Sequence, residues 1–327
     1  MHIPLKDMDP ALRFTGAVQR ALLGSHPALT FRLSGVNAKL FWIGRHTKAL
    51  RVEEKRIPRA DGSSLRLCVY RPLTPKENVP ALLWIHGGGL AMGCPEQEES
   101  IVQQFVDASG CLVVSPDYRL SMEAPYPAAL DDCYAALCWM RAHAEEYGAR
   151  TDQLFVAGGS AGGGLTAALT LYARDKGEIA VAFQMPWYPM IDDRMDTPSS
   201  QGNDDPVWSS KYNALAWKLY LGPLYGADDV PVYAVPARAE DLSGLPPTLT
   251  FCGTLEVFRD ATLAYVQRLR DCGVPVTFRL FARCYHAFQY TVPGAAVSRE
   301  ATAYYMEGFR YAVEHCFAPQ KETTGEA

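Results

Sequence analysis

Residues 154–163 read Leu-Phe-Val-Ala-Gly-Gly-Ser-Ala-Gly-Gly, and this stretch indicates the fold class. Its first four residues form the apolar run of a buried strand, and the small residues from Ala161 to Arg174 predict a helix. A serine between the two, with glycines on both sides, matches the G-x-S-x-G turn that displays a nucleophile at a strand end. We therefore expect Ser160 to be a nucleophile. The alternative is a glycine-rich turn that binds phosphate at the helix N-terminus.

Strands and helices alternate on both sides of this stretch, which implies a mainly parallel sheet with helices on both faces. The first two expected strands flank an Asp61-Gly62 turn and predict a hairpin. The expected strands are 51–58, 64–70, 81–85, 112–115, 154–157, 180–188, 248–252 and 276–281, and the expected helices are 11–23, 31–42, 96–109, 127–147, 161–174, 210–221, 260–272 and 298–315.

A second motif, His86-Gly87-Gly88-Gly89, directly follows the strand expected at 81–85. Consecutive glycines expose backbone N–H groups, which can converge on a developing oxyanion. We expect the N–H groups of Gly87, Gly88 and Ala161, the residue after the nucleophile, to form an oxyanion hole. His86 is expected to orient this loop rather than to transfer protons. The alternative is a flexible loop without a catalytic role.

The order of residues along the chain selects the base. In this type of sheet the serine comes first, the acid second and the histidine last. His286 follows the strand expected at 276–281, and a loop at the carboxyl end of a strand is where a base is displayed. His315 lies at the end of the last expected helix, where the helix dipole favours a cation, so we expect it to be structural.

The acid has two candidates after the strand expected at 248–252. Glu256 lies in the loop, and Asp260 lies in the first turn of the next helix, where the helix dipole stabilises any acid. We expect Glu256 to hold the imidazole tautomer of the base, and Asp260 remains the alternative.

These motifs resemble the hormone-sensitive-lipase-like branch of the α/β-hydrolase fold, a family of carboxylic ester hydrolases. The resemblance spans about Pro80 to His315. It implies an eight-stranded, mostly parallel sheet with a helical cap, and it aligns Glu256-Val257-Phe258-Arg259-Asp260 with the acid segment of the family. It rests on His86-Gly87-Gly88-Gly89, on Asp117-Tyr118-Arg119-Leu120 with Pro125-Tyr126-Pro127-Ala128-Ala129, on the Ser160 motif and on the His286 loop. Asp117 and Arg119 are expected to fix loops.

The chain departs from the family pattern at three positions. Gly159 stands where the family usually has Asp or Thr, Glu256 where it usually has Asp, and Ala287 where it usually has Gly. A longer Glu can still reach a ring nitrogen, so we expect activity. Gly159 removes a polar group beside the nucleophile.

The resemblance also sets the expected domain organisation. Residues 1–49 form an N-terminal cap segment, 50–317 the catalytic domain with a cap insertion at about 192–240, and 318–327 a frayed polar tail. The apolar residues near the catalytic loops are expected to line the substrate pocket. They are Leu90, Met92, Trp187, Tyr188, Trp208 and Phe288.

Composition excludes several other classes of protein. The 327 residues are 48% apolar and carry a net charge of −5 without a basic run, so nucleic acid is not an expected partner. No apolar run reaches the roughly 20 residues of a membrane helix, and the N-terminus does not resemble a secretory signal. The nine cysteines form no metal-binding spacing, which favours free thiols in the cytoplasm. We expect neither metal nor cofactor.

The sequence therefore predicts a serine ester hydrolase that acts on short-chain acyl esters of small molecules through an acyl-enzyme. Two alternatives are an amidase or N-deacetylase with the same triad, and a non-catalytic small-molecule receptor on the same fold. The presence of His286 disfavours the receptor, because such receptors lose the base. The resemblance also allows a homodimer formed through the last strand and helix.

Overall fold

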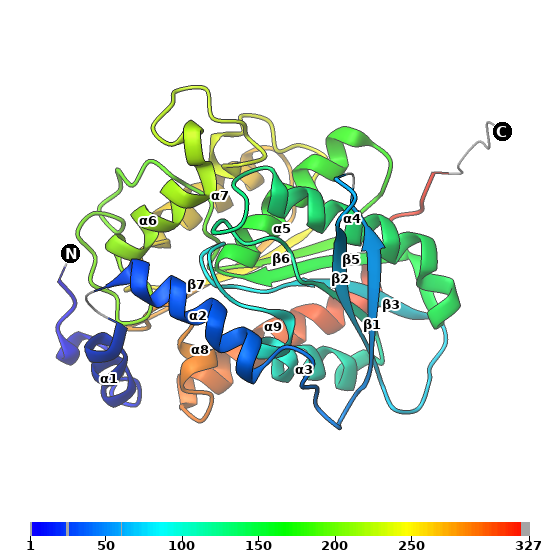
Figure 1. The fold of residues 1–327 in the computed structure, drawn as a ribbon, viewed down its shortest axis with the longest axis horizontal. Helices are drawn as coiled ribbons and strands as arrows, with labels where there is room; N and C mark the ends of the chain where they lie inside the picture. The colour runs from blue at the N-terminus through cyan, green and yellow to red at the C-terminus, as the bar shows by residue number, and fades with distance from the viewer. Residues whose placement is uncertain (1, 24–25, 60, 322–327) are drawn as a thin grey trace.

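A computed structural model describes residues 2–23, 26–59 and 61–321, and its centre is one twisted eight-stranded sheet (Figure 1). The strand order is β1-β2-β4-β3-β5-β6-β7-β8, in which β2 is antiparallel to both neighbours and the other pairs are parallel. The strands are β1 (Arg51–Pro58), β2 (Ser64–Arg71), β3 (Val79–Ile85), β4 (Leu112–Pro116), β5 (Ala149–Gly159), β6 (Phe183–Trp187), β7 (Thr248–Gly253) and β8 (Val276–Phe281). This confirms the predicted α/β-hydrolase fold.

Helices cover both faces of the sheet because its central strands are apolar on both sides. Every residue of β3 is buried, as expected for a parallel strand between two helical layers. One layer contains α4 (Ala128–His143), α5 (Ala161–Lys176) and α7 (Arg259–Asp271), and the other contains α3 (Glu99–Ser109) and α9 (Ala296–His315) (Figure 1).

Several expected elements differ from the structure in detail. The helix expected at 127–147 is α4 followed by a separate 3-10 turn, Ala144–Tyr147, and the one at 96–109 likewise begins with a 3-10 turn, Pro95–Glu98. The short helix α8 (Phe288–Thr291) was not expected. The prediction of a frayed tail at 318–327 is wrong for Gln320, because its side chain donates hydrogen bonds to the carbonyls of Thr151 and Ala180. The rest of that tail, from 322, lies outside the described residues.

Two segments far apart in sequence meet beside the carboxyl ends of the strands. The N-terminal segment (residues 2–49) contains α1 (Arg13–Leu23) and α2 (Pro27–Phe41), and the insertion (residues 192–240) contains α6 (Ser210–Leu221) (Figure 1). Phe31 of α2 stacks on Trp208, and Thr30 bonds the Tyr212 hydroxyl over 2.8 Å. These aromatic contacts join the segments into one layer.

Candidate active site

Ser160 lies at a sharp turn between β5 and α5. Its φ of 60° is in the left-handed region that residues with a side chain rarely adopt, so the turn is strained. The flanking glycines make the turn possible. A Cβ at Gly158 would lie 2.5 Å from the Ile85 carbonyl oxygen, and one at Gly162 would lie 2.0 Å from the same atom. The turn holds Ser160 at the carboxyl edge of the central strands.

The predicted base and acid meet Ser160 in one hydrogen-bonded row. Nε2 of His286 lies 2.8 Å from the Ser160 Oγ, and Nδ1 lies 2.7 Å from Oε2 of Glu256. The other carboxylate oxygen of Glu256 accepts the Gly253 N–H over 2.7 Å. Glu256 is fully buried, and only 3% of the His286 surface and 8% of the Ser160 surface are exposed. A buried carboxylate can therefore orient the ring toward the hydroxyl.

Asp260, the alternative acid, points away from this row. Its carboxylate accepts the Ser199 N–H over 2.8 Å and the Arg259 side chain over 2.7 Å. Burial alone would raise the pKa of Asp260, but these hydrogen bonds from Arg259 and Ser199 lower it. Asp260 thus attaches the insertion to the start of α7.

Sequence reasoning missed Asp205, which lies in the insertion. Its buried carboxylate accepts the backbone N–H groups of His286, Val207 and Trp208 over 2.8–3.0 Å. Burial raises the pKa of Asp205 to about 6. Asp205 therefore ties the loop of the base to the insertion, and no motif in the sequence marks it.

The glycine loop differs from the prediction at Gly87. The Gly87 N–H donates to Oε1 of Glu98 over 2.9 Å, so it is not available to an oxyanion. The N–H groups of Gly88 and Gly89 bond no protein acceptor within the described residues. Ala161 is the first residue of α5, so its N–H lacks an intrahelical partner. Among the described residues, the N–H groups of Gly88, Gly89 and Ala161 are therefore the donors left for an oxyanion.

Glu98 is the second residue that sequence reasoning missed. Its other oxygen, Oε2, accepts the indole N–H of Trp84 over 2.7 Å, so both oxygens receive an N–H. Burial raises the pKa of Glu98 to about 7, although the hydrogen bonds from Gly87 and Trp84 lower it. His86 occupies the structural position expected of it, because its ring stacks on Tyr118 and Nδ1 lies 2.8 Å from the Gly87 carbonyl.

A cavity of about 280 Å³ opens beside Ser160 and His286. Of the six predicted pocket residues, Met92, Tyr188 and Trp208 line it, together with Leu23 and Ser34 of the N-terminal segment. The other three are core residues in the structure, and their prediction is wrong: Leu90, Trp187 and Phe288. The Trp187 ring, for example, packs in the core against the rings of Trp84 and Tyr305.

Comparison with known proteins agrees with this geometry. The family described as alpha/beta hydrolase fold matches residues 82–290. Carboxylesterase NlhH of Mycobacterium tuberculosis is 35% identical over 257 residues, which cover 76% of this chain and 79% of the relative. The chain belongs to the hormone-sensitive-lipase-like carboxylesterases. An arylesterase of Saccharolobus solfataricus is 33% identical over 231 residues, covering 68% of this chain and 72% of that protein.

Solved structures support the same assignment. A bacterial heroin esterase superposes with a TM-score of 0.82 and 35% identity, over 94% of this chain and 99% of the other. A fungal esterase from Rhizomucor miehei gives a TM-score of 0.81 and 27% identity, over 94% and 98% of the two chains. Hydrolysis of carboxylic esters is therefore the activity of this family member.

Two departures of this carboxylesterase from its family pattern have a local explanation. A Cβ at Gly159 would lie 3.1 Å from the Tyr188 hydroxyl, so the Tyr188 ring occupies the space beside the nucleophile. That hydroxyl accepts a hydrogen bond from Gln289 over 2.6 Å. Ala287 has a φ of 54°, which lies in the left-handed region. The glycine that the family usually has at this position adopts such a φ without steric strain.

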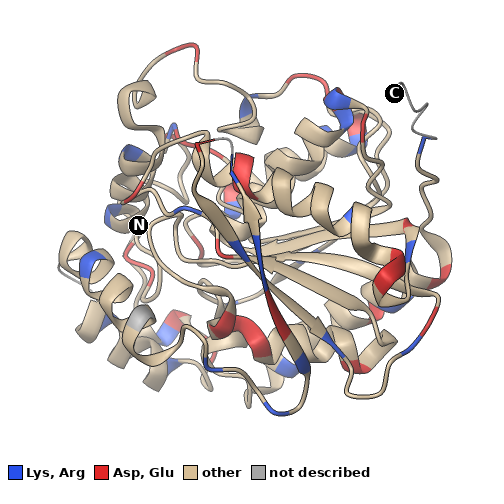
Figure 2. Ribbon diagram, turned by 45° about the vertical axis from the view of Figure 1, so that its right-hand side comes forward, with Lys and Arg blue, Asp and Glu red and all other residues tan. Residues whose placement is uncertain are grey.

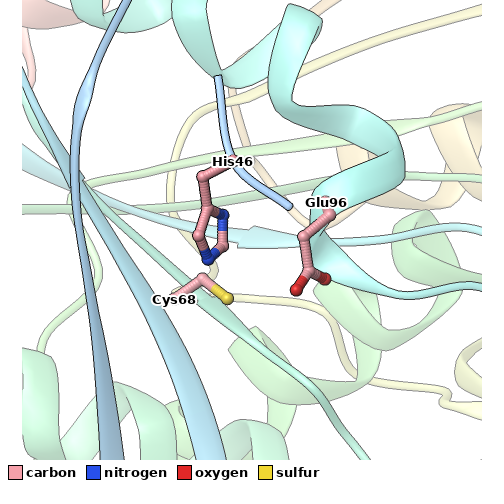
Figure 3. A group of neighbouring side chains, drawn as sticks. All are labelled: His46, Cys68 and Glu96. Carbon is pink, nitrogen blue, oxygen red and sulfur yellow. The ribbon is translucent and has the colours of Figure 1, made fainter. Parts of the chain in front are cut away.

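A second polar cluster of the carboxylesterase lies between the N-terminal segment and the sheet. The ligand-type atoms of His46, Cys68 and Glu96 lie within 4.8 Å of one another (Figure 3). The Arg66 guanidinium, however, donates to both oxygens of Glu96 over 2.7 and 3.1 Å, and to Asp117 over 3.0 Å. A metal ion at Glu96 would have to displace this internal cation, so the cluster is better described as a buried ion network.

Proposed function

We propose that this carboxylesterase works by acyl transfer, with Ser160 as the nucleophile and a covalent acyl-enzyme as the intermediate. The observation that carries the proposal is the row from the Ser160 Oγ through His286 to Glu256, with steps of 2.8 and 2.7 Å. His286 Nε2 would accept the serine proton as Oγ attacks the ester carbonyl, and would then deliver it to the leaving alcohol. Glu256 would stabilise the imidazolium formed between these steps.

The oxyanion would be held by the N–H groups of Gly88, Gly89 and Ala161. This set replaces the predicted one, because the Gly87 N–H is engaged by Glu98. Donors that are fixed before the reaction stabilise the developing charge without reorganisation, and each contributes about 10²–10³ in kcat. In the second half-reaction His286 would activate water to release the acid.

We further propose that the acyl group is short, of the acetyl to butyryl type. The cavity of about 280 Å³ lies just below the common range of about 300–1,000 Å³ for small-molecule sites. The N-terminal segment and the insertion contribute Leu23, Ser34 and Trp208 to its lining, which supports their description as a two-part cap.

The test is a fluorophosphonate label followed by an acyl-chain series. Labelling should modify Ser160, and kcat/KM for p-nitrophenyl esters should decline beyond butyryl. Matched amides should react far more slowly; faster amide hydrolysis would assign the enzyme to the amidases instead. A preference for long-chain triglycerides would contradict the short-chain proposal.

We also propose a cytoplasmic location and a small-molecule ester as the substrate. All nine cysteines are unpaired, as in proteins of reducing compartments. Within the described residues, no helix has the length and apolar character needed to cross a bilayer. The implied homodimer would use the exposed edge of β8 and α9, and light scattering of the purified protein tests it.

A further inference from the structure

The N-terminal segment carries a charge opposite to that of the whole chain. Between Pro10 and Val52 the sequence contains no Asp or Glu. The same stretch contains seven basic residues in a protein whose net charge is −5: Arg13, Arg20, Arg32, Lys39, Arg45, Lys48 and Arg51. Figure 2 shows how the acidic residues are distributed over the remaining elements. The N-terminal segment (residues 2–49), whose only acidic residues are Asp7 and Asp9, is therefore basic within an acidic enzyme.

The helices of this segment also expose large apolar side chains at helical spacing. On α1, Phe14 is 81% exposed and Leu22 is 78% exposed, with Val18 between them. On α2, the exposed residues recur every three or four positions, which places them on one face of the helix. They are Leu29, Leu33, Val36 and Leu40, and Phe41, Trp42 and Ile43 extend the exposed apolar surface beyond them.

The opposite sides of these helices are already used for packing. Phe31 and Ala38 of α2 are buried, and Phe31 stacks on Trp208 of the insertion. Leu12 and Gly16 are buried at α1, and a Cβ at Gly16 would lie 3.1 Å from Tyr285. Each helix is thus attached to the enzyme by one face and presents a second apolar face to solvent. Exposed apolar patches of this extent mark interaction sites.

Charge decides between the partners that could cover this face. A second copy in a two-fold dimer would bring the same basic segment against itself, and like charges would repel. An acidic lipid surface matches both properties, because basic amphipathic helices lie in the interface with their apolar face among the acyl chains. We propose that the N-terminal segment docks this carboxylesterase onto bilayers that contain anionic lipids.

Three of the basic side chains are available for this contact. Arg32, Arg45 and Lys48 are exposed and form no ion pair within the described residues. Arg13 donates to the carbonyls of Lys6 and Met8, so its guanidinium is engaged within the N-terminal segment. Phosphate headgroups would pair with the available cations while the leucines enter the apolar layer.

Docking in this orientation would bring the substrate cavity close to the lipid. Leu23, at the end of α1, and Ser34, on α2, line the cavity beside Ser160. Esters that partition into a bilayer would then enter beside the surface that holds the enzyme. The proposal goes beyond the catalytic function, since it concerns where the enzyme collects its substrate.

Vesicle co-sedimentation tests the docking without reference to activity. The wild type should sediment with phosphatidylcholine vesicles that contain 30% phosphatidylglycerol, much less with pure phosphatidylcholine, and less as salt rises. Arg32→Gln with Arg45→Gln should lower the partition coefficient roughly tenfold to thirtyfold. Leu33→Gln with Leu40→Gln should lower it at least as much.

A matched control removes the same charge elsewhere. Arg270 on α7 and Arg310 on α9 are exposed, and the double change Arg270→Gln with Arg310→Gln should leave the partition coefficient within twofold of wild type. Unchanged hydrolysis of dissolved p-nitrophenyl acetate by the Gln variants at Leu33 and Leu40 would show that they fold. The Ser160→Ala variant should still bind vesicles, so a failure of the catalytic proposal leaves this test intact.

Any one of four results would overturn the proposal. The first two are no vesicle binding by the wild type, and equal loss of binding in the control and in the Arg32 and Arg45 double variant. The third is a concentration-dependent dimer in light scattering that Leu33→Gln with Leu40→Gln abolishes, because that outcome assigns the face to a second copy. The fourth is binding that requires an acidic protein and not lipid.

Discussion

The backbone N–H of Gly87 donates to the Glu98 carboxylate over 2.9 Å. This bond joins the glycine loop to the 3-10 turn that precedes α3. The Trp84 indole N–H donates to the second oxygen of the same carboxylate over 2.7 Å. The neighbouring N–H groups of Gly88 and Gly89 have no acceptor in the part of the chain that the structure describes. Glu98 therefore holds the loop in the position from which the free donors can reach an oxyanion.

Replacing Glu98 by Gln should lower kcat roughly tenfold to a hundredfold, because the loop moves when one N–H meets an amide donor in place of an oxygen. KM should change much less, since both oxygens of Glu98 are engaged by N–H groups of the protein. The comparison is steady-state kinetics with p-nitrophenyl acetate. Gln97→Ala is the control, because this side chain lines the same cavity and, within the described residues, forms no hydrogen bond to the loop. Equal losses in both variants would remove the special role of Glu98.

Glu98 should also contribute to the pH dependence of kcat. Burial raises its pKa to about 7, so lowering the pH through 7 protonates the carboxylate. A protonated carboxyl keeps a single full acceptor, and one of the two N–H donors is then released. We expect kcat to fall on the acid side of pH 7 in the wild type and to fall less steeply there in the Glu98→Gln variant. A pH profile of identical shape in the two proteins would contradict this.

The two candidate acids can be separated by matched amide substitutions. Glu256→Gln should lower kcat about 10³–10⁴-fold, because the amide presents the wrong partner to the imidazole Nδ1–H. Asp260→Asn should cost less than tenfold, since its carboxylate bonds Ser199 and Arg259 instead. Circular dichroism of both variants verifies folding. A larger loss for Asp260→Asn would mean that the acid has been misassigned.

Local sequence motifs predicted the fold and the row from Ser160 to Glu256 better than they predicted the residues that line the cavity. Ser160, Glu256 and His286 could be predicted to lie together because each follows a strand in the order that the fold requires, and the structure brings them into one hydrogen-bonded row. Gly87 was misassigned because its hydrogen-bond acceptor, Glu98, carries no motif. Trp187 and Phe288 lie next to catalytic loops in sequence, yet both rings pack into the core, Trp187 against Tyr305 and Phe288 against Phe281. Asp205 was missed because the fold of the insertion, which no periodicity defines, brings it to His286.

Replacing Ala287 by Gly should stabilise the enzyme by about 1 kcal/mol, because its φ of 54° is strained for any residue with a Cβ. Urea denaturation measures the free energy of unfolding. Ala303→Gly, at an exposed position within α9, is the control and should destabilise by about 0.5–1 kcal/mol. Destabilisation by both substitutions would show that the left-handed position carries no strain.

If Ser160 is the nucleophile, the Ser160→Ala variant should lose hydrolysis of p-nitrophenyl acetate. The substitution removes the Oγ that lies 2.8 Å from His286 and leaves the rest of the row in place. We predict a loss in kcat of about a millionfold, or to the detection limit, with unchanged folding. Retention of a rate near that of the wild type would contradict this role of Ser160.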